Sequence, residues 1–244
     1  MRKGTNDFVS NADKSAEAVI LDILQTKFRS DGFLAEETGS AGNPKAEFQW
    51  CIDPLDGTSN FLHGAHNWCV SIGLLQNGQP VMGVVYDPTR KELFEGVVGI
   101  GARVNSGPVS VSSVGDPASA TIGIGHVPRV PIETFCLDTA RLLRAGYAFR
   151  QVGAGALMLA YVAAGRVDAY FERHMWPWDA VAGLALIRAA GGEHLPYNHA
   201  EQGGGGLVLA GGPELVRRTS GIVSGLRARC PGHAGRFCKR HESG

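Results

Sequence analysis

Cysteines and long apolar runs are both scarce in this chain. Only five of its 244 residues are cysteines, and their odd number and wide scatter argue against a disulfide framework. No apolar stretch approaches the length of a membrane span, and the first residues lack the apolar segment of a signal peptide. We therefore expect a soluble protein of the reducing cytoplasm that has no membrane partner.

Several catalytic signatures are missing as well. The sequence contains no Gly-x-Ser-x-Gly elbow, no paired CxxC motif and no Walker loop, so serine hydrolases and P-loop enzymes lose support. Glycine, by contrast, is abundant, and 34 glycines without a three-residue repeat indicate many tight turns. With 44% hydrophobic residues the chain can bury a sizeable core, as one large domain or two closely joined lobes.

The formal net charge of zero conceals a basic C-terminal tail. From Arg217 onward the chain carries seven basic residues and one acidic residue. Such a tail can attract nucleic acid or an acidic partner, but it has no interleaved aromatic pattern, so a solvated terminus is the simpler interpretation and nucleic acid is not expected as a partner. The spacing of Cys230, His233, Cys238 and His241 could close on zinc, yet it matches no standard finger order.

The string DPLDGTSNF at positions 53–61 is the most informative feature of the chain. It places Asp53 and Asp56 three residues apart after an apolar run, and two further acids, Glu36 and Asp179, lie far from it in sequence. Clustered carboxylates repel one another unless cations neutralise them, and hard oxygen ligands suit Mg²⁺ or Mn²⁺. The sequence therefore predicts a metal-dependent phosphate-ester enzyme.

Gly57 and Thr58 predict an anion site beside these carboxylates. A turn between Asp53 and Asp56 would direct both side chains at one pocket, and Gly57 removes a side chain where a ligand must approach the backbone. The amides of Gly57 and Thr58 would open a short helix and could bind phosphate. The alternative is that these are ordinary turn residues and Asp56 only caps a helix; the string as a whole favours the metal site.

The outer acids carry weaker signals when each is taken alone. Glu36 and Glu37 follow a predicted short strand, where neighbouring side chains point to opposite faces, so only Glu36 is chosen as a metal ligand. A solvated acidic pair is the alternative. Asp179 opens a predicted helix and could serve as its N-cap, a role that is compatible with metal binding.

Hydrophobic periodicity predicts a sheet-rich first half. Residues 48–52 read as a buried strand, and residues 69–75, 80–86 and 92–98 read as an antiparallel meander. An amphipathic helix is expected at residues 15–28, with Asp13 at or near its start. Its apolar positions at helical spacing are Val19, Ile20, Ile23, Leu24 and Phe28.

Beyond about residue 120 the pattern changes to helices that alternate with short strands. Helices are expected at residues 132–145, 155–165 and 179–190, with strands at 168–171 and 207–210. One more helix is expected after Pro213, and residues 202–206 read as an exposed loop.

Four ordered strings resemble motifs of the inositol monophosphatase family of Mg²⁺-dependent, lithium-sensitive phosphatases. They are DFVSNAD at 7–13, AEET at 35–38, DPLDGTSNF at 53–61 and WDAVAG at 178–183. The resemblance implies an α+β fold, the family's layered α-β-α-β-α sandwich, lacking most of the usual N-terminal helix. It also implies a homodimer.

The expected domain organisation follows from the same resemblance. One phosphatase domain spans residues 1–226, with a sheet-rich lobe at about 1–120 and an α/β lobe at about 121–226. Residues 227–244 form an irregular basic tail.

The resemblance further implies two or three Mg²⁺ ions. Glu36, Asp53 and the carbonyl of Leu55 would hold one ion, Asp53, Asp56 and Asp179 would hold a second, and Glu36 lies near a weaker third. Direct attack by water on phosphorus is the implied reaction.

Catalytic and substrate-binding positions carry over in the same way. Thr58, paired with Asp13, would orient the attacking water, and Glu36 is the third catalytic residue. The substrate-binding residues would be Gly57 and Thr58 through their amides, Glu172 through a contact with an inositol hydroxyl, and Gly153 and Ala154 as pocket lining. Ala154 replaces a commoner Ser or Thr.

The leading hypothesis is Mg²⁺-dependent hydrolysis of a small phosphorylated polyol, with inositol-1-phosphate as the first candidate. The same chemistry on histidinol phosphate, a sugar bisphosphate or a 3′-phosphonucleotide is an alternative that the motifs do not separate. A second alternative is a non-catalytic or regulatory protein that binds a macromolecule through its basic tail.

Overall fold

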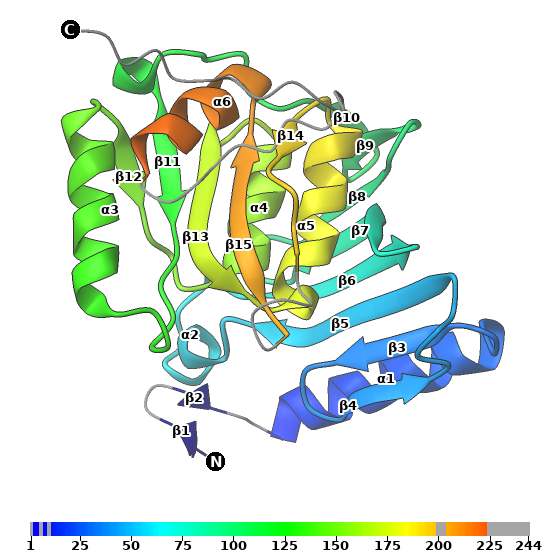
Figure 1. Cartoon of the computed structure of the whole chain (residues 1–244). Coiled ribbons are helices and arrows are strands. Elements are labelled where there is room, and N and C mark those ends of the chain that lie inside the picture. Colours follow the sequence, from blue (N-terminus) through cyan, green and yellow to red (C-terminus); the bar gives the residue numbers. More distant parts are fainter. Residues whose placement is uncertain (1, 5–6, 9–10, 199–203, 224–244) are drawn as a thin grey trace, which may run out of the picture.

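The computed structural model describes residues 2–4, 7–8, 11–198 and 204–223, and these form two large sheets with helices packed against them (Figure 1). A small ribbon of β1 (Arg2–Gly4) and β2 (Asp7–Phe8) lies near the N-terminus. The predicted basic tail, the four Cys and His residues within it and residues 202–203 of the predicted loop lie outside the described residues. The prediction of an exposed loop at 202–206 is wrong for its described part, because Gly205 and Gly206 are buried and Gly206 begins a strand. Gly205 packs so closely on the His174 ring that a Cβ atom there would clash with it.

The first large sheet has eight strands in the order β10-β9-β8-β7-β6-β5-β3-β4. All neighbouring strands are antiparallel except β3 and β5, which run parallel. The strands are β3 (Gly32–Ala35), β4 (Gly39–Gly42), β5 (Phe48–Asp56), β6 (Cys69–Gln76), β7 (Gln79–Asp87), β8 (Glu92–Val97), β9 (Gly101–Val104) and β10 (Gly107–Val109).

The second large sheet has five strands in the order β12-β11-β13-β15-β14. Strand β11 runs parallel to both β12 and β13, whereas β15 is antiparallel to β13 and β14. The strands are β11 (Thr121–Ile124), β12 (Ala148–Arg150), β13 (Ala169–Met175), β14 (Glu193–His194) and β15 (Gly206–Gly211).

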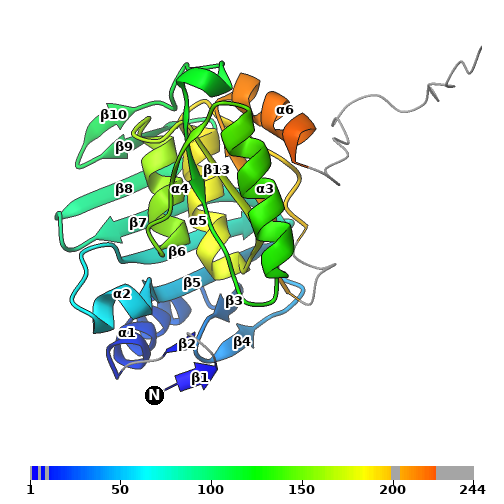
Figure 2. The same cartoon turned by 90° about the vertical axis from the view of Figure 1, so that its left-hand side faces the viewer.

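Helices cover the two sheets in layers. Helix α1 (Asn11–Lys27) packs on β5, while α4 (Gly155–Ala163) and α5 (Pro177–Ala189) lie against each other between the sheets (Figure 2). Helices α3 (Ile132–Arg144) and α6 (Pro213–Ile222) cover the other face of the second sheet. The remaining short helices are α2 (Thr58–Leu62) and a 3₁₀ turn at Pro117–Ser119. The predicted α-β-α-β-α sandwich is thus confirmed.

Two glycines in neighbouring strands let α5 lie directly on the first sheet. A Cβ atom on Gly83 would come within 2.1 Å of the carbonyl oxygen of Ala182, and one on Gly73 within 2.6 Å of the Ala182 nitrogen. Both contacts are far shorter than van der Waals separation, so only glycine fits at these positions. The close approach fixes the start of α5, and with it Asp179, above the C-terminal end of β5.

The hydrophobic face of α1 is narrower than its sequence predicts. The helix begins at Asn11 rather than Ser15, and Ile20 and Leu24 pack against the core as expected. Val19 and Ile23, predicted on the same face, are 60% and 48% exposed. The reason is geometric, because α1 contacts the sheet mainly along β5 and that contact accommodates only one edge of the predicted apolar stripe.

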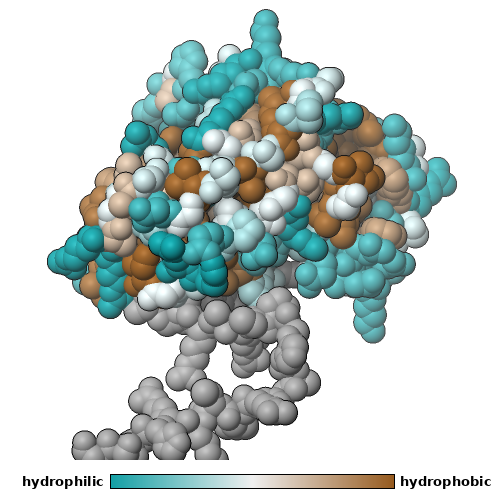
Figure 3. Space-filling model, turned by 90° about the horizontal axis from the view of Figure 1, so that it is seen from above, coloured by the Kyte–Doolittle hydropathy of each residue, from teal (hydrophilic) through white to brown (hydrophobic). Residues whose placement is uncertain are grey.

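The other expected elements lie where the periodicity placed them, to within a few residues. The predicted meander is β6, β7 and β8, and the predicted helices after residue 120 are α3, α4, α5 and α6. Among the described residues no helix has the length and hydropathy to cross a membrane. On the face seen from above in Figure 3, hydrophilic residues occupy much of the rim, and separate groups of hydrophobic residues lie nearer its middle.

Candidate active site

A β-bulge brings Asp53 and Asp56 to the same face of strand β5. Asp53 lies opposite Ser71 and Asp56 opposite Cys69, so three steps along β5 match two steps along β6. In a regular strand, residues three apart point to opposite faces, and the extra residue restores a common direction. Pro54 has no N–H to lose and is tolerated at such a bulge. The predicted turn after residue 52 is therefore wrong: the strand continues to Asp56.

Asp179 completes a cluster of three carboxylates. One oxygen from each of Asp53, Asp56 and Asp179 lies within 4.8 Å of the others. The helix that carries Asp179 is tied to the sheet beside it, because the hydroxyl of Ser71 donates to the carbonyl of Trp178 at 3.1 Å. The structure thus brings together three acids that are up to 126 positions apart in the sequence.

Burial and neighbouring negative charges disfavour three ionised carboxylates in this cluster. Burial, then the charges of Glu36, Asp179 and Asp56, raise the pKa of Asp53 well above its usual value. Burial and the charges of Asp56 and Glu36 do the same to the pKa of Asp179. Such mutual repulsion is relieved when a cation occupies the cluster.

The first turn of α4 holds Asp56 in place. Its carboxylate accepts hydrogen bonds from the backbone N–H groups of Gly155, Ala156 and Leu157 at 3.2, 2.8 and 3.3 Å. These bonds oppose the effect of burial, which raises the pKa of Asp56 to about 6. The result is a carboxylate whose orientation is fixed by a helix N-terminus before any ligand arrives.

Asp13 and Thr58 meet beside the cluster although 45 positions separate them. The Thr58 hydroxyl lies 3.1 Å from Asp13 Oδ1 and 3.0 Å from the Leu55 carbonyl oxygen, so its single hydrogen can serve either acceptor. Asp13 is fully buried in the first turn of α1. The contact predicted between these two residues is therefore present.

Gly57 adopts the left-handed conformation that the corner requires. Its φ is 90°, and a Cβ atom there would lie 2.8 Å from the carbonyl oxygen of Asn67. The next helix, α2, is held by the Asn60 side chain, which donates to the carbonyls of Asn67 and Val152 at 2.6 and 2.8 Å. The corner after β5 is thus tied to the segment that leads into α4.

Glu36 lies at the same edge of the sheet, and a second glutamate supports it. The charge of Glu36 contributes to the raised pKa of both Asp53 and Asp179. Beneath it, the buried Glu17 of α1 accepts hydrogen bonds from the backbone N–H groups of Glu37 and Thr38 at 2.8 and 2.9 Å. Sequence reasoning missed Glu17, although it follows Asp13 by one helical turn and therefore shares its face.

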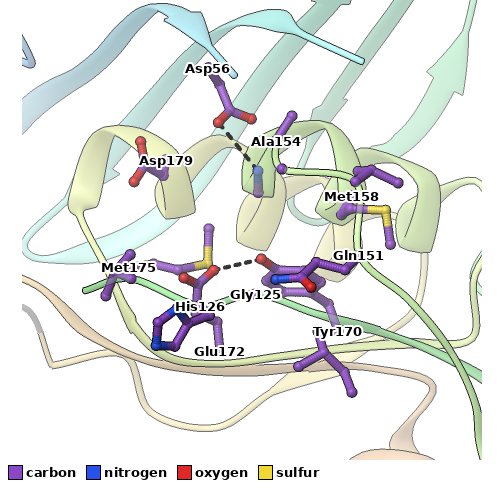
Figure 4. A pocket seen from close by; sticks show the side chains of 15 residues that line it. Asp56, Gly125, His126, Gln151, Ala154, Met158, Tyr170, Glu172, Met175 and Asp179 are labelled. Atoms are coloured by element: carbon purple, nitrogen blue, oxygen red, sulfur yellow. Dashed lines mark hydrogen bonds between the residues drawn. The ribbon is translucent and has the colours of Figure 1, made fainter. Parts of the chain in front are cut away.

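A cavity of about 180 Å³ opens beside Asp56 and Asp179 (Figure 4). It lies between α4, β13 and the segment after β11. The predicted substrate residues Gly153, Ala154 and Glu172 all line it, whereas Gly57 and Thr58 do not. Other lining residues that the sequence analysis did not single out are His126, Gln151, Met158, Tyr170 and Met175.

Glu172 is the acid at the far side of this cavity. It is 6% exposed, and burial raises its pKa to about 7. The Tyr170 hydroxyl donates to Glu172 Oε2 at 2.6 Å. The cavity therefore has the cluster of three carboxylates on one side and Glu172, a hydrogen-bond acceptor, on the other.

The donor set of the cluster fits Mg²⁺ better than a softer metal. Every donor is a carboxylate oxygen, and no histidine or cysteine belongs to the described cluster. The Cys69 thiol lies 3.7 Å from Asp56 Oδ2, but burial raises its pKa well above the usual value, so it is no thiolate ligand.

The comparisons with known proteins agree with this geometry. The sequence profile of the inositol monophosphatase family matches residues 2–238. This chain belongs to the inositol monophosphatase family. It is 39% identical to the Nus factor SuhB of Escherichia coli over 224 residues, which cover 88% of this chain and 82% of that protein.

Two further relatives carry the name of the enzyme itself. The inositol-1-monophosphatase of Synechocystis is 40% identical over 188 residues, which cover 76% of this chain and 66% of that protein. The structure of inositol monophosphatase from Anabaena superposes with a TM-score of 0.83 at 38% identity and covers 91% of this chain and 89% of that one.

Family membership and the acidic cluster together establish the general chemistry. The protein is a metal-dependent phosphatase of a Mg²⁺-dependent family that acts on phosphorylated substrates. The prediction that nucleic acid is not a partner receives no support from a relative that is named as a Nus factor.

Proposed function

We propose that this protein hydrolyses a small phosphorylated polyol, with inositol-1-phosphate as the first candidate, by direct attack of water on phosphorus. The observation that carries the proposal is the compact cluster of Asp53, Asp56 and Asp179 beside a cavity that ends at Glu172. Two relatives that are 38% and 40% identical to this chain over the aligned residues are named for the same activity. Cytoplasmic location and a homodimer belong to the same proposal.

The metal ligands are assigned from the cluster and its neighbours. Asp53 would help to hold two ions, one together with Glu36 and the Leu55 carbonyl and the other together with Asp56 and Asp179. A third ion near Glu36 would be weaker. When bound, Mg²⁺ supplies Lewis-acid activation of water and neutralises charge on the phosphoryl oxygens.

Thr58 and Asp13 are assigned to the attacking water. Because the Thr58 hydroxyl donates its hydrogen to Asp13 or to the Leu55 carbonyl, its lone pairs remain to accept a hydrogen bond from water. Water held in this way is directed at phosphorus, and Glu36 is assigned to assist the loss of its proton. The amides of Gly57 and Thr58 are assigned to the phosphoryl oxygens.

The other end of the substrate is assigned to the cavity. Glu172 would accept a hydrogen bond from a hydroxyl of the leaving group. Gly153 and Ala154 would lie against its carbon skeleton, because neither adds a bulky side chain there.

Phosphate release from inositol-1-phosphate, measured with and without Mg²⁺, tests the proposal. Asp53→Asn should lower the rate at least about 100-fold, since it removes one charge from the ligand shared by two ions. Asp22→Asn, the same substitution at an exposed position of α1, should leave the rate unchanged. Release that persists without Mg²⁺ or in Asp53→Asn would show that this site does not perform the reaction.

A second candidate function is regulatory binding, and the name of the Escherichia coli relative as a Nus factor favours it. In this case the basic residues after 226 would bind an acidic macromolecule independently of hydrolysis. Removal of residues 227–244 should then abolish binding to a mixed-sequence RNA oligonucleotide while phosphate release continues. Equal RNA binding by the full and shortened chains would exclude the tail as the binding element.

A further inference from the structure

Tyr170 and Glu172 form a buried pair whose geometry the proposed function does not yet explain. They are two positions apart on β13, so both side chains point to the same face and into the cavity (Figure 4). Tyr170 is 2% exposed and Glu172 is 6% exposed. The intervening Phe171 points to the opposite face, where it packs in the core beneath α3.

The direction of their hydrogen bond is fixed by chemistry. Burial and the neighbouring charge of Glu172 raise the pKa of Tyr170 well above its usual value, so the phenol keeps its hydrogen. The hydroxyl therefore donates, and Glu172 Oε2 accepts at 2.6 Å. No hydrogen bond from the part of the chain that the structure describes engages the other carboxylate oxygen, Oε1, which can therefore accept one from a ligand in the cavity.

Glycines on two neighbouring segments make room for the pair. A Cβ atom on Gly125 would lie 2.0 Å from Glu172 Oε2 and 2.3 Å from the Tyr170 hydroxyl oxygen. On the other side, a Cβ atom on Gly155 would lie 3.3 Å from the same hydroxyl. The hydrogen bond thus occupies a slot that any larger residue at position 125 would close.

The charges around the cavity limit what can occupy it. Three carboxylates line it, those of Asp56, Glu172 and Asp179, and His126 is the one basic side chain among its described lining residues. Mg²⁺ at the cluster would offset Asp56 and Asp179 but would leave Glu172 at the far side. Above about pH 7, where Glu172 is ionised, a second phosphate group on the substrate would face this carboxylate and be repelled.

We propose that Tyr170 is a positioning residue that holds Glu172 as a hydrogen-bond acceptor, so that the site selects a neutral, hydroxyl-bearing leaving group over one that carries a second phosphate. The proposal rests on the proposed function and deepens it. Among the alternative substrates, it favours a polyol monophosphate over a sugar bisphosphate or a 3′-phosphonucleotide that carries a second phosphate.

Tyr170→Phe tests the positioning role, because it keeps the ring and removes only the hydroxyl. For inositol-1-phosphate, kcat/KM should fall about tenfold. For p-nitrophenyl phosphate, whose leaving group offers no hydroxyl donor to Glu172, it should change less than about twofold. Tyr161→Phe is the matched control, since the Tyr161 hydroxyl donates to Asp87 at 3.3 Å outside this cavity.

A second variant separates positioning from folding. In a Glu172→Gln background, Tyr170→Phe should cause no further selective loss on inositol-1-phosphate, because the two residues act as one unit. Glu172→Gln should also narrow the preference for inositol-1-phosphate over fructose-1,6-bisphosphate by about tenfold, since it removes the repelling charge.

The outcomes are distinguishable. If Tyr170→Phe lowers kcat/KM equally for inositol-1-phosphate and p-nitrophenyl phosphate, or for neither, the positioning role is overturned. If Glu172→Gln leaves the preference for inositol-1-phosphate over fructose-1,6-bisphosphate unchanged, the selection by charge is overturned. If the unsubstituted protein hydrolyses no phosphate ester, the proposed function fails. Calorimetric binding of inositol-1-phosphate with Mg²⁺ then decides the role of Tyr170, with about tenfold weaker affinity expected for Tyr170→Phe and equal affinity overturning it.

Discussion

Three carboxylates within one small cluster show how function and stability conflict at the scale of single residues. Burial raises the pKa values of Asp53, Asp56 and Asp179, and the charges of neighbouring carboxylates raise those of Asp53 and Asp179 further. A bound cation reverses that penalty, so the cluster is suited to metal and costly without it.

Asp179→Asn should therefore stabilise the metal-free protein. The folded-state pKa of Asp179 lies above its unfolded value, so its contribution to stability is present at low pH and is lost as pH rises toward the folded value. The penalty for ionising Asp179 in the folded protein grows as the pH rises above the unfolded pKa, and it is absent in asparagine. In the presence of a chelator, the unfolding midpoint of the variant at pH 8 should rise by about 3 °C or more.

The advantage of this variant should shrink as the pH falls toward 5, because the penalty on aspartate decreases as the pH approaches its unfolded pKa. Asp22→Asn, at an exposed position, should shift the midpoint by less than about 2 °C at either pH. A lower midpoint for Asp179→Asn than for the unsubstituted protein at pH 8 without metal would contradict the account.

At the scale of elements, the close packing of α5 against the first sheet positions the site. The helix lies so close to β7 that Gly83 faces the backbone of Ala182. Asp179 occupies the first turn of the same helix, so a displaced α5 would move one of the three clustered carboxylates relative to the other two.

Gly83→Ala should lower both stability and activity. The added Cβ would lie 2.1 Å from the carbonyl oxygen of Ala182, and α5 must move to relieve this contact. We expect a loss of about 2 kcal/mol or more in the free energy of unfolding and a fall in phosphate release that added Mg²⁺ does not restore. Denaturant unfolding and initial rates measure the two effects.

Gly221→Ala is the matched control, because a Cβ atom there meets nothing within 4 Å and the residue lies in α6. It should leave activity unchanged and stabilise the helix slightly. If Gly83→Ala has the same free energy of unfolding and the same rate of phosphate release as this control, the close packing of α5 does not position the site.

Sequence reasoning located most elements but missed the local geometry that aligns them. Alternating apolar residues predicted the strands of the meander correctly, whereas Asp-Pro and Asp-Gly suggested a turn where β5 continues through a bulge. A proline inside a strand pattern is a signal for a bulge, and Pro54 could have been read in that way.

Contacts that are distant in the sequence could not be predicted from periodicity. The pairing of Asp13 with Thr58 entered through the family resemblance, and the structure shows the hydrogen bond. Tyr170 could have been noticed because it alternates with Glu172, but only the fold shows that Gly125 leaves the space in which the two side chains meet.

At the scale of the whole molecule, the site lies where elements from both sheets converge. Strand β5 of the first sheet supplies Asp53 and Asp56, the strand β13 of the second supplies Glu172, and the helices between the sheets supply Asp179 and the amides that bind Asp56. This arrangement places the carboxylate cluster beside the cavity, so that Asp56 and Asp179 line it.

Hydrolysis of inositol-1-phosphate in ¹⁸O-labelled water with Mg²⁺ is the most direct test of the central claim. Direct attack on phosphorus predicts one labelled oxygen in the released phosphate after a single turnover and no label in the inositol. Release by Asp53→Asn should be at least about 100-fold slower. Label in the inositol, or unaltered release by Asp53→Asn, would contradict the account.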